Sequence, residues 1–325
     1  MKKIQLIKSV AIGFTLLFSA QSQAETFPNK PIRWIVPYSA GGTTDVMARH
    51  LATEMGKALK QTIVIDNKPG AASIIGATAI ARATPDGYTI GTVDSGTLAF
   101  NPALYKSLTY DAMKDFSFIG GLGKMPIVLA VNNSFPANNL SQFVDMVNKE
   151  PGKITSASSG HGSPLHMALE LFNHKQKLNL LHVPYKGSAP AVQDLVSGQV
   201  NSIFVDLPPS ISMIQAKKMK VLAVATPERL DILPDVPTFD EAGIKGFEAY
   251  AWQSLVGPKG LPKNKLDILN KALNDALTSD TIQKKFSEIG IQPMPMSQQQ
   301  LDSFARSEHD SWGKLIRDAE IKLAN

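Results

Sequence analysis

The sequence contains no cysteine among its 325 residues, which excludes disulfide bridges and thiolate metal sites. Its N-terminal apolar stretch, residues 9–20, is shorter than the roughly 20 residues that a membrane-spanning helix needs. The excess of positive over negative charge is also small. The formal net charge is only +5, which predicts no nucleic-acid-binding surface. With 43% hydrophobic residues, the chain must fold by burying apolar surface alone.

The N-terminus has the organisation of a secretory signal peptide, residues 1–24. Lys2, Lys3 and Lys8 precede the uncharged stretch, and the small residues Ser22 and Ala24 follow it. We therefore expect export and cleavage after Ala24, which lowers the formal charge to +2 because three lysines are removed.

Apolar runs of β type alternate with helical patterns through most of the chain, as is typical of an α/β fold with largely parallel sheets. We expect strands at 32–36, 62–66, 89–93, 127–131, 154–157, 179–183, 202–205, 221–225 and 250–256. We expect helices at 47–59, 73–83, 163–172, 189–197 and 263–277, and a last one beginning at 297 with a capping box.

The stretch VPYSAGGTTD, residues 36–45, joins the first strand to the first helix. Gly41 and Gly42 leave the main-chain N–H groups uncovered, and Thr43 or Thr44 can cap the helix. Unpaired N–H groups and the helix dipole make such a turn an anion site. A tight turn without a ligand is the alternative that this motif alone leaves open, and the absence of GK[ST] and GxGxxG disfavours nucleotides.

The stretch SASSGHGSPLHMALELF, residues 156–172, repeats this arrangement in the second half of the chain. Ser159 and Gly160 precede Ser163, a predicted N-cap, and Pro164 at the first helical position. His166 falls in the first turn of the helix, where it either approaches the site or packs in the core.

Two acidic residues, Asp94 and Asp206, end apolar strands and precede turns. The carboxyl ends of parallel strands are where open α/β sheets bind ligands, so both are candidate site residues. The alternative is that each carboxylate only caps the turn that follows it.

Signatures of catalysis and of metal binding are weak. The chain has no GxSxG and no HExxH, and His161, His166 and His174 have no metal-ligand spacing. We predict no metal site, no cofactor and no enzyme. A secreted serine hydrolase using Ser163 with His166 is the alternative, disfavoured because neighbours on one helical turn pair poorly as nucleophile and base.

Several segments resemble the Bug family, the periplasmic solute receptors of tripartite tricarboxylate transporters. The resemblance rests on VPYSAGGTTDVMAR, IDNKPGAASIIGATAIARATPDGYTI, SGTLAFNPALY, ASSGHGSPLHMALELF, VPYKGSAPAVQDLVSGQV, VLAVATPERLDILPDVPTFDEAG and GPKGLP, in the family's order. It implies a two-lobed type II periplasmic-binding-protein fold (Venus flytrap) with a hinge and a central cleft. We expect residues 25–125 and 226–325 to form lobe 1, and residues 126–225 to form lobe 2.

The resemblance further implies that main-chain N–H groups of both lobes hold a carboxylate of the ligand. The expected ligand-binding residues are Tyr38, Ala40, Gly41, Gly42, Thr43, Asp94, Ser159, Gly160, Ser163, His166 and Asp206. The family often has Asp-Asn or Asp-Ser before Leu-Pro, whereas Leu207 directly follows Asp206 here.

The implied function is capture of a small organic carboxylate, a di- or tricarboxylate or an aromatic acid, in the periplasm. The closed receptor would deliver it to transporter subunits, or would act only as the partner of a sensor kinase. We expect a monomer that binds no nucleic acid.

Overall fold

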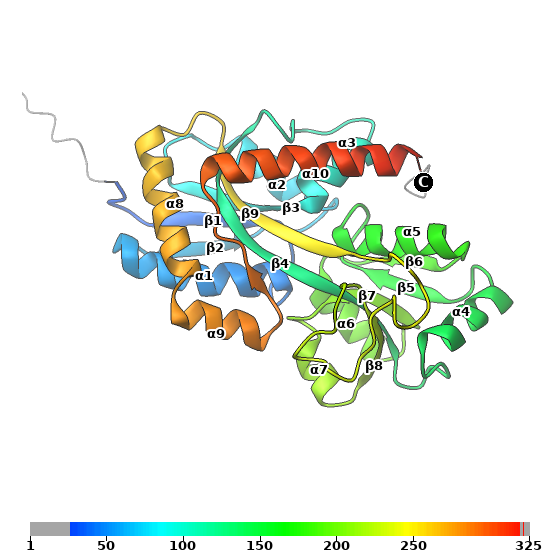
Figure 1. Cartoon of the computed structure of the whole chain (residues 1–325). Helices are drawn as coiled ribbons and strands as arrows, with labels where there is room; N and C mark the ends of the chain where they lie inside the picture. The colour runs from blue at the N-terminus through cyan, green and yellow to red at the C-terminus, as the bar shows by residue number, and fades with distance from the viewer. Residues whose placement is uncertain (1–26, 319–320, 322–325) are drawn as a thin grey trace, which may run out of the picture.

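Two long strands, β4 (Phe116–Asn132) and β9 (Tyr250–Pro258), run between the two lobes of this α/β molecule (Figure 1). They pair antiparallel from Phe116 opposite Pro258 to Pro126 opposite Tyr250. The computed structural model describes residues 27–318 and residue 321, so the expected signal peptide lies outside the described residues.

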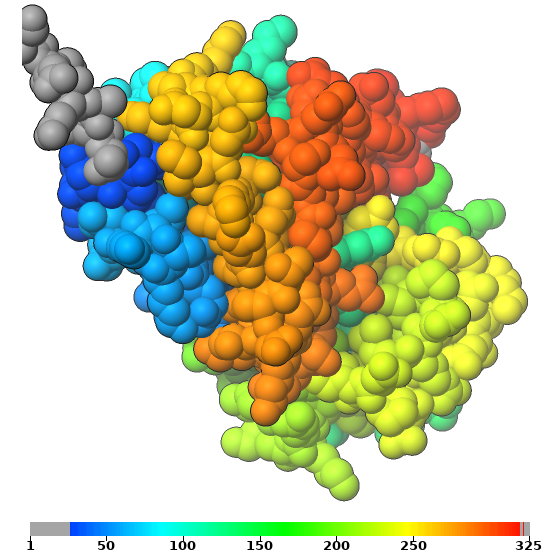
Figure 2. Space-filling model, turned by 60° about the vertical axis from the view of Figure 1, so that its left-hand side comes forward, coloured from blue at the N-terminus to red at the C-terminus, as the bar shows by residue number. Residues whose placement is uncertain are grey.

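The first lobe is built on parallel strands that continue into β9 and β4, in the order β2-β1-β3-β9-β4. Its other strands are β1 (Ile32–Val36), β2 (Ile63–Asn67), β3 (Thr89–Asp94) and β10 (Gln292–Pro293). Its helices are α1 (Thr43–Leu59), α2 (Ile74–Ala81), the π-helical turn η1 (Gly96–Phe100), α3 (Asn101–Leu104), α8 (Lys263–Leu277), α9 (Asp280–Glu288) and α10 (Gln298–Asp318). Figure 2 shows α8 lying beside α1 on the outer face of this lobe.

The second lobe continues the sheet in the order β4-β7-β5-β6, and β8 pairs with β4 on a separate branch. Its strands are β5 (Thr155–Ser158), β6 (Leu181–Pro184), β7 (Ser202–Asp206) and β8 (Met219–Val224). Its helices are α4 (Leu140–Lys149), α5 (Pro164–Gln176), α6 (Ser188–Val196) and α7 (Ile211–Gln215). Since β4 exchanges β9 for β7 and β8 as partners after Pro126, the turn of the sheet from one lobe to the other falls there.

Each lobe has its own hydrophobic core. Trp34, Met47 and Leu269 are fully buried in the first, and Phe172 and Phe204 are fully buried in the second. Burial of such large side chains is the main driving force for each lobe, at about 1.5–3 kcal/mol per side chain.

The predicted division of the chain stays a prediction, and the packing suggests one change to it. Phe239 stacks on Phe204 and Phe247 packs against it at a tilt in the second core, although residues 226–249 were expected in lobe 1. We propose that the return to the first lobe falls near Tyr250, where β9 begins.

Most expected elements are present, with informative differences. The strand expected at 127–131 is only the end of β4, while α4 and α9 were not expected. The cap of α1 is Gly42, so the prediction of Thr43 or Thr44 is wrong, and both threonines lie in the first turn. The capping box of α10 is confirmed, because Ser297 and Gln300 exchange side-chain to main-chain hydrogen bonds of 2.9 and 3.2 Å.

Among the described helices, none combines the length and the apolar composition that crossing a bilayer requires.

Candidate functional site

A small cavity of about 20 Å³ lies where the starts of α1, α5 and α6 converge from the two lobes. It is lined by Tyr38, Gly42, Thr43, Thr44, Asp94, Ser159, Pro164, Leu165, Ser188, Asp206, Ala251 and Gln253. This volume holds about one water molecule. The lining set, drawn from the described residues, includes no lysine or arginine, so any anion here must be held by main-chain and neutral donors.

One side of the cavity, called here the first jaw, is the β1–α1 loop, residues 37–42. Gly42 is extended, and within the described structure no side chain caps the helix, so the first-turn N–H groups of Thr43 and Thr44 have no helical partner. Gly41 has φ of +82°, which glycine adopts without strain, and its N–H donates to Asp45 Oδ2 at 2.9 Å. The Gly41 donor is therefore used to hold the loop.

Asp45 anchors this loop from inside the first lobe. Arg49 Nε donates to Asp45 Oδ2 at 2.9 Å and Asn67 Nδ2 donates to Oδ1 at 3.0 Å. Burial alone would raise the pKa of Asp45, but the hydrogen bonds from Arg49, Gly41 and Asn67 outweigh it and lower the pKa. The carboxylate is thus held ionised, and its partners fix the position of the turn.

The second jaw is the β5–α5 loop. Ser163 caps α5 as predicted, with its hydroxyl accepting from the His166 N–H at 3.2 Å. Pro164 has no N–H to offer, which leaves that of Leu165 as the first-turn donor facing the cavity. Gly160 has φ of +127°, and a Cβ there would lie 3.1 Å from the Tyr185 carbonyl oxygen.

Asp94 and Asp206 both end strands, as predicted, and both are buried at the cavity. Tyr38 Oη donates to Asp94 Oδ2 at 2.6 Å, and Thr97 donates twice to Oδ1 at 2.8 Å. Ser188 Oγ donates to Asp206 Oδ1 at 3.2 Å. Burial raises the pKa of each of the two carboxyl groups, which favours their neutral forms next to a bound anion.

Two polar atoms at the cavity lack a protein partner among the described residues. They are Thr43 Oγ1 and Gln253 Oε1, both fully buried. The Gln253 amide is oriented from its other end, where Nε2 donates to Thr44 Oγ1 at 2.7 Å. Buried polar groups are normally paired, so these atoms fit a site that a ligand or water completes.

A second cavity of about 230 Å³ adjoins the first and shares Tyr38 and Ser159 with it. One wall is the turn Ala71–Ser73, whose φ angles of 46°, 50° and 69° are left-handed and costly for residues other than glycine. The cavity is large enough for the body of a small organic ligand. A wider hollow of about 680 Å³ on the outer side of α1 contains no predicted site residue.

Some of the predicted site residues line one of the two cavities, and the others lie beside or behind them. Tyr38, Gly42, Thr43, Asp94, Ser159 and Asp206 line the small cavity, and Gly160 lines the larger one. Ala40 and Gly41 are exposed beside the first jaw, while Ser163 and His166 are buried behind the second. Binding roles for all of them stay predictions.

Six lining residues of the small cavity were not predicted as site residues: Thr44, Pro164, Leu165, Ser188, Ala251 and Gln253. The Val-Pro-Tyr common to IVPYSAGG and HVPYKGSA was the signal that could have indicated Ser188, because α6 starts after the second copy. Gln253 comes from the middle of β9, and no local pattern indicates that it faces the cleft.

The geometry does not fit the hydrolase alternative. His166 Nδ1 accepts from the Gly162 N–H at 3.0 Å, and Nε2 lies 3.3 Å from Glu170 Oε1. The Ser163 hydroxyl accepts from a main-chain N–H at the helix start. Both ring nitrogens of His166 thus contact groups other than the Ser163 hydroxyl, so His166 is not placed to act as its base.

The fold and this cleft define a class of protein, the two-lobed solute-binding receptors. The family model described as "Tripartite tricarboxylate transporter family receptor" matches residues 47–321. The chain therefore belongs to that family, whose members are binding proteins and not enzymes.

Solved structures agree with this assignment. The periplasmic binding protein BugD is 34% identical, with a TM-score of 0.88 over 91% of this chain and 99% of that one. Rpa4515 of R. palustris with adipate is 32% identical, with a TM-score of 0.88 and coverage of 91% and 99%. MatC from Rhodopseudomonas palustris with bound malate is 33% identical, with a TM-score of 0.85 and coverage of 89% and 100%.

Proposed function

We propose that this protein is a periplasmic receptor that closes over a small organic carboxylate. The observation that carries the proposal is the convergence of helix starts from both lobes, with α1 lacking a side-chain cap, on a buried cavity whose described lining includes no lysine or arginine. One carboxylate of the ligand accepts from the N–H groups of Thr43, Thr44 and Leu165, directly or through water. The rest of the ligand occupies the 230 Å³ cavity.

Hydrogen bonds from main-chain N–H groups can supply enough free energy for binding of this kind. Micromolar affinity needs about 8 kcal/mol. Three or four charge-assisted hydrogen bonds at roughly 1.5–3 kcal/mol each supply it, less the cost of ordering the ligand and closing the lobes. Because closure removes water, the same donors act in a medium of lower dielectric constant.

The relatives support the ligand class, since adipate and malate are both named as ligands of similar proteins. A di- or tricarboxylate is therefore the first choice, and an aromatic acid is the second. We further propose that the closed monomer delivers the ligand to the membrane subunits of a tripartite tricarboxylate-type transporter. A sensor kinase is the alternative recipient of the same closed form.

The test is a titration of the purified protein with matched acids and amides. Succinate, malate, adipate, citrate and benzoate are compared with succinamide, adipamide and benzamide by thermal shift and calorimetry. At least one carboxylate should stabilise the protein while its amide does not. Stabilisation by the neutral amides alone would overturn the proposal. Loss of uptake of the bound acid in a strain lacking the protein would distinguish transport from signalling.

A further inference from the structure

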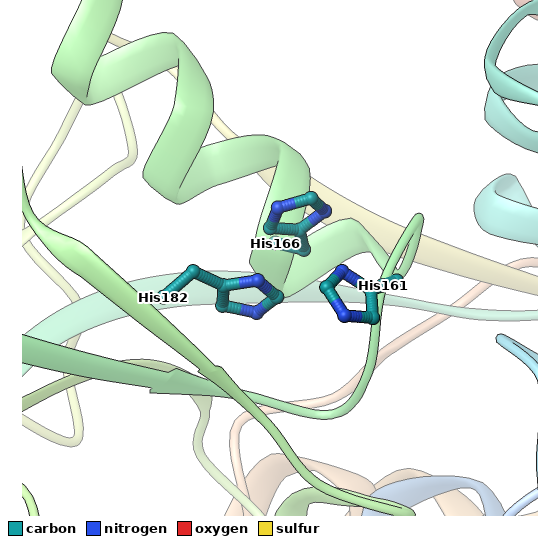
Figure 3. Close-up of side chains that lie close together, drawn as sticks. All are labelled: His161, His166 and His182. Atoms are coloured by element: carbon teal, nitrogen blue, oxygen red, sulfur yellow. The ribbon is translucent and has the colours of Figure 1, made fainter. Parts of the chain in front are cut away.

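Three histidines from separate parts of the second lobe meet beside the β5–α5 jaw (Figure 3). His166 lies on α5, His182 on β6, and His161 in the loop between β5 and α5. One ring nitrogen of each lies within 4.8 Å of one from each of the others. The rings of His166 and His182 stack with centroids 3.9 Å apart, and His161 meets His182 edge-on at 4.9 Å.

The hydrogen bonds of His166 define which of its nitrogens carries the proton. Because the Gly162 N–H donates to Nδ1, that nitrogen has a lone pair and the proton is on Nε2. Nε2 lies 3.3 Å from Glu170 Oε1. A carboxylate that accepts from one nitrogen of a histidine whose other nitrogen binds metal is a recurrent feature of metal sites.

His182 is arranged in the same way. The Ser158 hydroxyl lies 2.7 Å from His182 Nε2 and is also 3.3 Å from the Gly160 carbonyl oxygen, to which it donates. In the tautomer in which the hydroxyl accepts from His182 Nε2–H, the lone pair of the ring is on Nδ1 and can bind a metal.

His161 supplies the third nitrogen and a path of entry. Its Nδ1 is buried and has no hydrogen-bond partner among the described residues. The residue also lines the 230 Å³ cavity, through which an ion can reach the cluster. Gly160 and Gly162, with φ of 127° and 72°, flank His161 and allow the loop to adjust.

We propose that His161, His166 and His182 bind one divalent transition-metal ion of the Zn²⁺, Ni²⁺ or Cu²⁺ type. Three neutral imidazoles are the ligand set that these ions prefer, and hard ions such as Mg²⁺ are excluded by the absence of oxygen ligands in the set. Binding requires the nitrogens to move to about 2.0–2.1 Å from the metal. The Gly162 N–H must then release His166 Nδ1, and a glycine on each side of His161 gives the loop backbone the conformational freedom for this change.

The test uses purified protein without a histidine tag, stripped with EDTA and titrated with Zn²⁺ by calorimetry, with Mg²⁺ as the control ion. One equivalent of Zn²⁺ should bind, and Mg²⁺ should not. His161→Ala and His182→Ala should each lower the affinity for Zn²⁺ at least about tenfold. His174→Ala, which changes an exposed histidine on the same helix, should leave it unchanged.

Absence of saturable Zn²⁺ binding, or equal affinities of the His161→Ala and His174→Ala variants, would overturn the proposal. X-ray absorption of the Zn²⁺ complex gives a second readout, with three imidazole nitrogens expected at about 2.0–2.1 Å. Fewer than three would also contradict it. An unchanged circular dichroism spectrum of each variant shows that the fold is kept. The Zn²⁺ titration uses no carboxylate ligand, so its result does not depend on the proposed function.

Discussion

Ser39 in the first jaw and Lys186 in the second lobe are joined directly. The Ser39 hydroxyl and the Ser39 N–H both donate to the Lys186 carbonyl oxygen, at 2.9 and 3.2 Å. Since these residues belong to different lobes, both hydrogen bonds form only when the lobes close. The structure therefore represents the closed form of the receptor.

Replacing Ser39 with alanine should weaken ligand binding without loosening either lobe. A neutral hydrogen bond contributes about 0.5–1.5 kcal/mol, so removing one that exists only in the closed form should raise Kd about 2- to 10-fold. Calorimetry measures Kd, and the melting temperature without ligand should stay the same. An unchanged Kd would show that the contact does not contribute to closure.

Substitutions of Gly42 test how large a side chain fits between the two jaws at this position. A Cβ there would meet the Ser188 nitrogen of the other lobe at 3.9 Å, which is ordinary contact, so Gly42→Ala should bind almost normally. The branched side chain of Gly42→Val should block the approach of the jaws and weaken binding at least about tenfold, which is 1.4 kcal/mol. Calorimetry and thermal melts separate binding from folding, and an equal loss in both would make this glycine purely structural.

Binding should be coupled to uptake of a proton at Asp206. Burial raises the pKa of this carboxyl group, and a second negative charge in the cavity raises it further. Protonation therefore favours the complex, so affinity should increase from pH 8 to pH 6, by at most about tenfold per unit for one proton. Asp206→Asn should bind as well or better at pH 8, and its affinity should depend less steeply on pH, because only Asp94 of the two buried carboxyl groups can still take up a proton. Affinity that falls toward pH 6 would contradict this coupling.

Asp45 should stabilise the folded protein in a pH-dependent way. Its pKa is lowered because the hydrogen bonds of Arg49, Gly41 and Asn67 outweigh the effect of burial. The stabilisation is therefore present above the unfolded pKa of about 3.9 and is lost as the pH falls through the folded pKa. Asp45→Ala should lower the free energy of unfolding by about 2–3 kcal/mol at pH 7. Urea titrations should show this difference shrinking toward pH 3, and a constant difference would exclude the linkage.

The sequence predicted the elements whose pattern is local. Ser163 caps α5 and Asp94 and Asp206 end their strands, because caps and strand ends depend on a few neighbouring residues. The first half of β4 was missed because Gly120, Gly121 and Pro126 interrupt a strand pattern that its pairing with β9 sustains.

Long-range relationships could not be predicted. Gln253 reaches Thr44 across 209 residues of sequence, and His182 meets His161 and His166 only because β6 pairs with β5. The spacing of His161 and His166 alone gave no reason to expect a cluster. Such contacts follow from the register of strands, which one sequence does not specify.

In the proposed complex, main-chain N–H groups, and not a charged side chain, hold the carboxylate between the lobes. A crystal structure with the tightest-binding acid of the titration panel tests it most directly. We predict carboxylate oxygens at about 2.7–3.2 Å from the nitrogens of Thr43, Thr44 or Leu165, or from waters bound to them. A carboxylate paired instead with a lysine or arginine side chain, such as that of Lys186, would contradict it.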